Sequence, residues 1–437
     1  MFNTEKNIIK AFITSLVIFL LTIFIPKISL HASTITPIFD NKNLKKEVAL
    51  KAIKADQNLG VFTIELNDKF DKIKHNYVHI AKEQNNHKYE WQKKELAPEL
   101  ALPLIITHND KKVVIIGTDH SYQNTYITIQ NFDDFFNYDT LNNQQINIKK
   151  YLPNLDYQKK FHLNKTKFNP LSLSKQTNQD IKYFWTGVDN STLNIWTKLD
   201  NEFISLDVNT LEMNTHKLPL DIKNSGKELK ITNQILSYNN GIYYAAFDID
   251  NTVVSTNYGI NHKIYYSYNA SNWNESSIEN QFGEYEILLD SYNLGSELYQ
   301  FSINIDFSNF ISTTNVWKIS DIVTPWNKSN IKIPGESYII SLNKIGQLYN
   351  IIIMTPNSSY NQYDIRYFNT KEFDNFDYNS ATPEIAETVN PQYKSLFYKN
   401  VTENNSDISY LEKHYAYKLD DKNQKAKNFK FELLKVQ

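Results

Sequence analysis

Two carboxylates and a hydroxyl alternate along one short stretch of this chain, YYAAFDIDNTVV (residues 243–254). Asp248, Asp250 and Thr252 follow an apolar run that is typical of a buried strand. A carboxylate in such a place can act as a catalytic nucleophile. Hard oxygen atoms at alternate positions also suit calcium, although the Gly and Glu of the full calcium loop are missing here. The third interpretation is a strand that runs into a turn.

The Asp-x-Asp-x-Thr pattern resembles the nucleophile motif of phosphatases of the haloacid dehalogenase type. The resemblance implies that Asp248 attacks phosphate and that Asp250 acts as acid and base. It further implies roles for Thr355 and, in binding magnesium, for Asp420 and Asp421. That family builds a parallel sheet, which needs crossover helices, whereas residues 241–437 show almost no helical periodicity. We therefore interpret DIDNT (248–252) as a turn motif and expect no catalytic residue.

The position of Asp248 within its repeat, where one strand of a pair enters its turn, recurs in other repeats of the chain. Asp119, Asp189, Asp306 and Thr355 also lie where one strand of a pair enters its turn. Asp bonds its own backbone two residues on, so turn formation explains the recurrence. The same turns carry the residues that we predict to contact a ligand: Asp119, Asp189, Asp248, Asp250, Asp306 and Trp273.

A second resemblance concerns SYNASNW (residues 267–273), which is similar to the Asp-box turn of sialidase-type propellers. Asn269 replaces the Asp of that turn, and Trp273 comes one residue early. Catalysis in that family uses three Arg, and this chain has only Arg366, so the resemblance implies shared architecture and not shared catalysis. Other propeller glycosidases use paired Asp and Glu near the axis.

Two histidines, His75 and His79, stand four residues apart in HNYVH. On a helix they could share a metal ion, but in a strand they face one side and lie too far apart for one ion. No Glu follows His75 as the zinc-protease motif requires. We therefore predict solvent-exposed histidines, no metal site and no cofactor.

The elements that position these residues are pairs of short strands. The pairs cover residues 111–132, 181–199, 241–273, 298–319 and 348–370, with weaker copies from Val61 and Leu396. Their second strands begin near Tyr77, Tyr126, Leu193, Ile264, Val316, Ile365 and Ile408. Propeller blades of the WD40 and kelch kinds repeat every 40–50 residues or so, with loop insertions, and four strands fit that length.

The spacing predicts an all-β chain, a β-propeller of about six or seven four-stranded antiparallel blades. The alternative is an irregular pair of β domains that meet near residue 225. We place the repeat domain at residues 59–437, after a signal segment (1–32) and a leader with a short helix (33–58). The helix is expected at residues 44–56, where Leu44, Val48 and Ala52 share one face and Glu47 precedes Lys51 by four.

The N-terminus indicates export. Lys6 and Lys10 precede the apolar run of residues 11–25, and Leu30-His31-Ala32 fits a cleavage site. The alternative is an uncleaved anchor, which would be the chain's contact with the membrane. Formal net charge is -2, with 46 basic and 48 acidic residues, so nothing in the balance attracts nucleic acid. The chain has no Cys and therefore no disulfide framework.

These features predict a bacterial binding or adhesion protein, secreted or held on the extracellular face of the cell membrane. It would present loops on a rigid β-repeat scaffold. We expect its partner to be a host or neighbouring cell-surface protein or glycan. The alternative function is a secreted hydrolase, namely a glycosidase that uses paired Asp and Glu near the propeller axis.

Overall fold

The computed structural model describes most of the chain after residue 34. The described residues are 35–40, 47–55, 58–67, 72–83, 88–96, 100–120, 125–136, 150–151, 181–197, 201–220, 230–250, 259–276, 282–283, 285–309, 311–319, 326–335, 337–357, 362–389, 393–401, 409–417 and 429–436. The predicted signal segment and its cleavage site lie outside them. In the described part, no helix is both long and apolar enough to cross a membrane.

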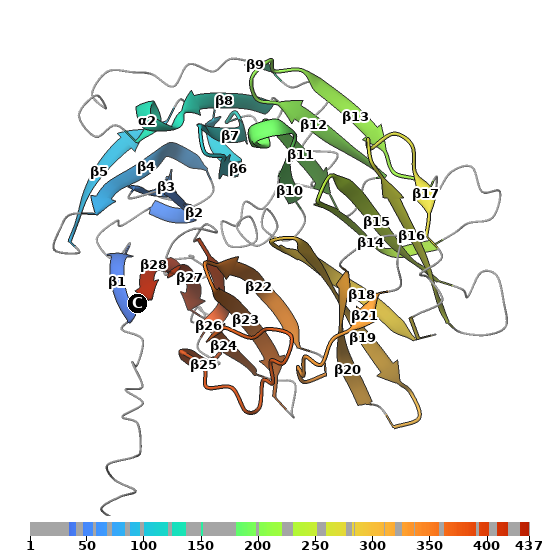
Figure 1. The fold of residues 1–437 in the computed structure, drawn as a ribbon. Coiled ribbons are helices and arrows are strands. Elements are labelled where there is room, and N and C mark those ends of the chain that lie inside the picture. The colour runs from blue at the N-terminus through green and yellow to red at the C-terminus, as the bar shows by residue number, and fades with distance from the viewer. Residues whose placement is uncertain are drawn as a thin grey trace, which may run out of the picture. The chain divides into compact units, whose positions relative to one another are not determined.

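Seven four-stranded antiparallel sheets form from the described residues and are arranged as the blades of a β-propeller (Figure 1). We number the blades 1–7 along the chain. Blade 1 contains β2 (Glu47–Ala55), β3 (Asn58–Leu66), β4 (Ile73–Glu83) and β5 (Tyr89–Glu95). Blade 2 contains β6 (Leu102–His108), β7 (Lys112–Thr118), β8 (Thr125–Asn131) and β9 (Lys150–Tyr151). Blade 3 contains β10 (Ile181–Thr186), β11 (Thr192–Thr197), β12 (Glu202–Asp207) and β13 (Met213–Lys217).

The second half of the chain builds four further blades. Blade 4 contains β14 (Lys230–Asn239), β15 (Ile242–Asp250), β16 (Ile260–Ser267) and β17 (Asn274–Glu275). Blade 5 contains β18 (Glu286–Leu294), β19 (Glu297–Asp306), β20 (Ile311–Ile319) and β21 (Asn327–Lys328). Blade 6 contains β22 (Tyr338–Ile345), β23 (Leu348–Pro356), β24 (Tyr363–Thr370) and β25 (Ile385–Thr388). Blade 7 contains β26 (Tyr393–Asn400), β27 (Ser409–Tyr417), β28 (Phe429–Val436) and β1 (Ile35–Asp40).

The first strand of each blade lies nearest the centre, and the innermost strands of blades 1 and 2, and of blades 3 to 7 in succession, contact one another. Blade 7 contacts β2 of blade 1 through β27 and β28. Blade 7 is closed differently from the others, because the N-terminal strand β1 pairs with the C-terminal strand β28 as its outer edge. The two ends of the described chain thus share one sheet. The predicted propeller is confirmed, with seven blades.

The segment expected to be a helix is instead β2, so that prediction is wrong. An innermost strand is covered on both faces, and its apolar residues therefore do not alternate. Val48, Ala49, Leu50, Ala52 and Ile53 are all buried. A β-bulge between Ala49 and Lys51 also shifts the register. In a short segment this pattern mimics the periodicity of a helix. The described helical elements are only α2 (Phe132–Phe135) and the 3₁₀ turn η2 (Val188–Asn190).

The core is a ring of apolar layers between neighbouring blades. Blades 4 and 5 meet through a layer with Tyr244, Ile264 and Trp317, and blades 7 and 1 through one with Phe39 and Tyr410. Similar layers separate the other blades. The blades therefore stabilise one another face to face.

Among the turns that the structure describes, tight two-residue hairpins join the first and second strands of blades 4, 5 and 6. In blade 4, Asn240 (φ 48°) and Gly241 (φ 83°) form the two-residue turn between Asn239 and Ile242. Positive φ at both central residues is what a type I′ turn requires, and Asn-Gly supplies it at little cost. The corresponding turns of blades 5 and 6 contain Gly295 and Gly346, also at positive φ. We call the propeller face that bears these turns the hairpin face.

Candidate functional site

Asp248 lies inside strand β15 and not in the turn that follows it. The strands expected at 243–247 and 263–268 are adjacent and antiparallel, as predicted. Their ladder continues through the pair Asp248↔His262 to Asp250↔Ile260, so placing Asp248 in a turn is wrong. The side chain of Asp248 is 0% exposed. The physical reason is that buried polar partners replace the solvent that a turn would have supplied.

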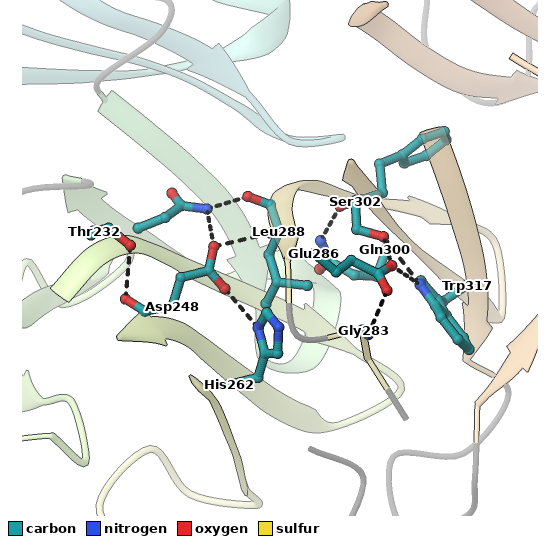
Figure 2. A network of polar contacts seen from close by, with 11 residues as sticks. Thr232, Asp248, His262, Gly283, Glu286, Leu288, Gln300, Ser302 and Trp317 are labelled. Atoms are coloured by element: carbon teal, nitrogen blue, oxygen red, sulfur yellow. Dashed lines mark hydrogen bonds and ion pairs between the residues drawn. The ribbon is translucent and has the colours of Figure 1, made fainter. Parts of the chain in front are cut away.

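Three donors hold the Asp248 carboxylate (Figure 2). His262 Nδ1 lies 2.9 Å from Oδ1, and the backbone N–H of Leu288 donates to Oδ2 at 2.9 Å. The side-chain amide of Asn233 also donates to Oδ2, at 3.4 Å. Burial raises the pKa of Asp248, and the contacts with His262 and Leu288 oppose that rise. Because Leu288 belongs to blade 5, this carboxylate ties blade 4 to blade 5.

A similar arrangement joins blades 7 and 1. Glu412 in β27 accepts the backbone N–H of Ala52 in β2, and its other oxygen lies 2.9 Å from His414 Nε2. Like Asp248, Glu412 comes from the second strand of its blade, pairs with a histidine, and reaches the innermost strand of the next blade. Each accepted N–H belongs to a strand that contains a bulge. We call Asp248–His262 and Glu412–His414 the inter-blade clamps.

Glu286, the first residue of β18, is the centre of a second network in Figure 2. It accepts hydrogen bonds from Ser302, from Asn315 at 3.0 Å, from Trp317 at 3.0 Å and from the backbone of Gly283 at 2.9 Å. Burial alone would raise the pKa of Glu286, but these donors lower it. The carboxylate is enclosed by its donors and is 2% exposed as a residue, which suits a structural role.

Glu47, the first residue of β2, holds an equivalent network in blade 1. It accepts from Thr63 at 2.7 Å, pairs with His79 at 2.8 Å and contacts Lys93. Burial would raise the pKa of Glu47, yet the bonds from His79, Lys93 and Thr63 outweigh it and lower the pKa to about 2. His79 is therefore buried, and the expectation that it lies in solvent is wrong, because it pairs with a buried carboxylate. His75 is partly exposed and contacts Glu95 at 2.7 Å.

The other residues predicted to bind a ligand do not converge. Asp119 follows the second strand of blade 2, while Asp250 and Asp306 end the second strands of blades 4 and 5, so all three lie opposite the hairpin face. Asp189 (φ 54°) follows a first strand and lies on the hairpin face, where it pairs with Lys111 at 3.0 Å. Their role in ligand binding stays a prediction.

Two of the predicted residues have local contacts that explain their positions. Asp306 accepts from the backbone of Ser308 at 2.9 Å and from Asn309 at 2.9 Å, which confirms the predicted turn at this position. Trp273 lies between β16 and β17 and donates its indole N–H to the carbonyl of Lys217 in blade 3, at 3.1 Å. Trp273 therefore connects the outer parts of blades 3 and 4.

Side chains from several blades meet near the propeller axis. Lys182 of blade 3 lies 3.3 Å from Asp290 of blade 5, and Lys51 of blade 1 donates to the hydroxyl of Tyr183 in blade 3. Each contact skips one intervening blade. Side chains of non-adjacent blades can meet in this way only on the inner side of the innermost strands. We call Lys51, Tyr183, Lys182 and Asp290 the axial cluster.

Two members of the axial cluster, Lys51 and Asp290, lie at or next to β-bulges. Lys51 directly follows the bulge in β2, and Asp290 lies in the bulge between Leu288 and Ser291 in β18. A bulge breaks the strict alternation of side chains and can redirect one of them. Burial lowers the pKa of the Lys51 ammonium to about 8, although the nearby Glu412 carboxylate opposes this. Each pair offers hydrogen-bonding groups to a polar ligand, and Tyr183 adds an aromatic ring.

The sequence reasoning did not single out the axial cluster. Its signal was weak: Lys182 is the single charge of its strand, and Lys51 and Asp290 share their strands with other charged residues. Within the described ranges, no group of three or more His, Asp or Glu side chains is placed to hold a metal ion.

No protein-family profile matches this sequence, and no curated relative was found. Solved structures that are similar include the β-propeller domain of the Trilobed protease from Pyrococcus furiosus, with 9% identity over 84% of this chain and 92% of that chain, at a TM-score of 0.45. A family 117 glycoside hydrolase from Zobellia galactanivorans shares 9% identity over 59% of this chain and 91% of that one, at a TM-score of 0.32.

Trypanosoma rangeli sialidase shares 10% identity over 90% of this chain, at a TM-score of 0.33. This chain spans about half of the sialidase, 54% of its length. All three are similar to this protein in fold alone, and at these values they carry no argument about activity. The propeller itself is established by the strand pairing described above.

Proposed function

We propose that this protein is an exported binding protein that holds a glycan at the axis of the propeller. The observation that carries the proposal is the axial cluster, two pairs of side chains that bridge non-adjacent blades: Lys51 with Tyr183, and Lys182 with Asp290. Hydroxyl-rich ligands need donors and acceptors, which the ion pair supplies, and a ring to stack on, which Tyr183 supplies. The predicted export of the chain would bring the site to cell-surface glycans.

A glycan array with the purified protein tests this proposal. Wild type is expected to bind a restricted set of glycans, and Tyr183→Ala to bind them at least about tenfold more weakly, because ring and hydroxyl are both lost. Tyr268→Ala is the matched control, since Tyr268 is 63% exposed on blade 4 and outside the axial cluster. Equal loss in both variants, or binding that Tyr183→Ala leaves intact, would place the ligand elsewhere.

The alternative is a glycosidase, and one observation favours it. Asp290 is a carboxylate that reaches the axial cluster and remains partly exposed, at 30% of its side chain. The buried carboxylates Asp248, Glu286 and Glu412 are instead enclosed by donors. Assays against aryl glycosides and natural oligosaccharides decide between the functions. Turnover by wild type that is lost in Asp290→Asn, with unchanged melting temperature, would make the protein an enzyme.

A further inference from the structure

Lys51 differs from several other lysines whose contacts are known. Lys93, Lys182, Lys318 and Lys413 each have a carboxylate oxygen within ion-pair distance. In the described part of the chain, the ammonium of Lys51 donates instead to two neutral oxygens, the backbone carbonyl of Ile106 and the hydroxyl of Tyr183. Its charge therefore lacks a directly bonded counter-charge.

The surroundings of Lys51 stabilise the amine without neutralising its charge. The ammonium lies 4.9 Å from the centroid of the Tyr183 ring. His108 lies close enough for Lys51 to lower its pKa, in addition to the effect of burial. The carboxylate of Glu412 acts on Lys51 from a distance, while it accepts from Ala52 and pairs with His414. Burying an ammonium without a close anion is unfavourable, and an arriving anion removes that cost.

Tyr183 can bind the same anion. Its hydroxyl oxygen accepts from Lys51, which leaves the O–H proton to be donated outward. An ammonium and a phenol side by side form a two-donor site for one oxyanion, and hydrogen bonds to a charged acceptor are the stronger kind. Lys51 has three donors and uses two of them in the contacts just described.

We propose that Lys51 and Tyr183 form a subsite for a carboxylate, so that the axial ligand is an acidic sugar and not a neutral one. This inference deepens the proposed function and rests on the same cluster. The carboxylate would receive one hydrogen bond from the Lys51 ammonium and one from the Tyr183 hydroxyl. Lys182 already has Asp290 as a counter-charge, so a second anion is not required there.

The test follows the titration of individual lysines by NMR in protein that carries ¹³C-labelled lysine. Glucuronate is the probe and glucose the neutral control. Saturable binding of glucuronate is expected to raise the pKa of Lys51, assigned through Lys51→Arg. Lys94 is the internal control, because burial lowers its pKa as well but it lies on β5, outside the axial cluster.

Tyr183→Phe keeps the ring and removes the hydroxyl, and it is expected to raise the apparent dissociation constant of glucuronate about fivefold, as one lost hydrogen bond would. Equal pKa shifts at Lys51 and Lys94 would mean simple screening by salt and would overturn the inference. A pKa of Lys51 that glucuronate does not change would overturn it as well. One outcome separates the two proposals: Tyr183→Ala loses glycan binding, but glucuronate does not change the pKa of Lys51. That result supports the proposed function and contradicts only the carboxylate subsite.

Discussion

Asp248 accepts the backbone N–H of Leu288 across the boundary between blades 4 and 5, at 2.9 Å. The donor belongs to an innermost strand, next to its bulge, and the acceptor to the second strand of the preceding blade. Glu412 and Ala52 repeat the relationship where blade 7 meets blade 1. The carboxylate that most resembled a catalytic nucleophile in the sequence therefore serves to hold two blades together.

Removal of the Asp248 carboxylate is expected to destabilise the fold. Asp248→Ala leaves the Leu288 N–H and His262 without their acceptor in a buried layer, so the free energy of unfolding should fall by about 3 kcal/mol. Chemical denaturation measures this change. Asp306→Ala is the matched control in an exposed turn and should lower the midpoint much less, because only local hydrogen bonds to Ser308 and Asn309 are lost. Equal midpoints for Asp248→Ala and wild type would contradict the clamp.

Ring closure depends on the apolar contacts of β1. Phe39 packs with its ring centroid 4.7 Å from Trp91 of blade 1 and 6.0 Å from Phe431 of blade 7. Phe39→Ala should lower the free energy of unfolding by about 3–4 kcal/mol, because it opens a cavity at the closing blade. Phe307→Ala, at a position that is 56% exposed, is the control. Thermal melting of both variants measures the difference, and similar small losses would show that closure does not depend on Phe39.

The network of Glu47 predicts a loss of stability in acid. Its pKa falls from 4.5 to about 2 in the folded protein, so its contribution is present above pH 4.5 and is lost as the pH falls through 2. The difference in unfolding free energy between wild type and Glu47→Gln should shrink over that window. Denaturant titrations at several pH values measure it. In Lys93→Met the loss should be smaller and should be complete at a higher pH, since one of the contacts that lower the folded pKa of Glu47 is gone. An unchanged profile would contradict this.

Lys51 predicts a gain of stability in base, with the same sign of pH dependence. Its pKa falls from 10.5 to about 8 in the folded protein, so between these values the unfolded chain binds more protons than the folded one. The free energy of unfolding of wild type, relative to Lys51→Met, should therefore rise from pH 8 to pH 10.5. Denaturation in buffers without added oxyanions measures it. A flat difference would mean that the folded environment does not disfavour the ammonium.

Much of the fold could be predicted from strand pairs, but not the position of each strand within its blade. For blades 1, 2, 4, 5 and 6 the predicted pairs are the second and third strands, such as β7–β8. In blades 3 and 7 they are the first and second strands, β10–β11 and β26–β27. Whether apolar and polar residues alternate along a strand depends on what packs against its two faces. The local pattern alone therefore does not distinguish the first strand of a blade from the second.

The candidate site was harder to predict than the fold. The Asp residues chosen from the sequence shared a turn-like slot, and for Asp306 the turn is what the structure has. At the equivalent position of blade 4, Asp248 instead lies within a strand. Hydrogen-bond donors from β16 and β18 stabilise its buried carboxylate there. No local signal distinguishes these two environments, since the donors come from other strands and another blade.

The sequence by itself determined the repeated strand pairs and local turns, because alternation of apolar residues and turn-forming pairs such as Asn240-Gly241 act through neighbours in the chain. Only the tertiary structure decided which charges are buried and which meet at the axis. Lys51 and Tyr183 are 132 residues apart in sequence, and Glu412 and Ala52 are 360 apart. Such pairs come together only when the blades close into a ring, and burial between blades then sets the chemistry of each group.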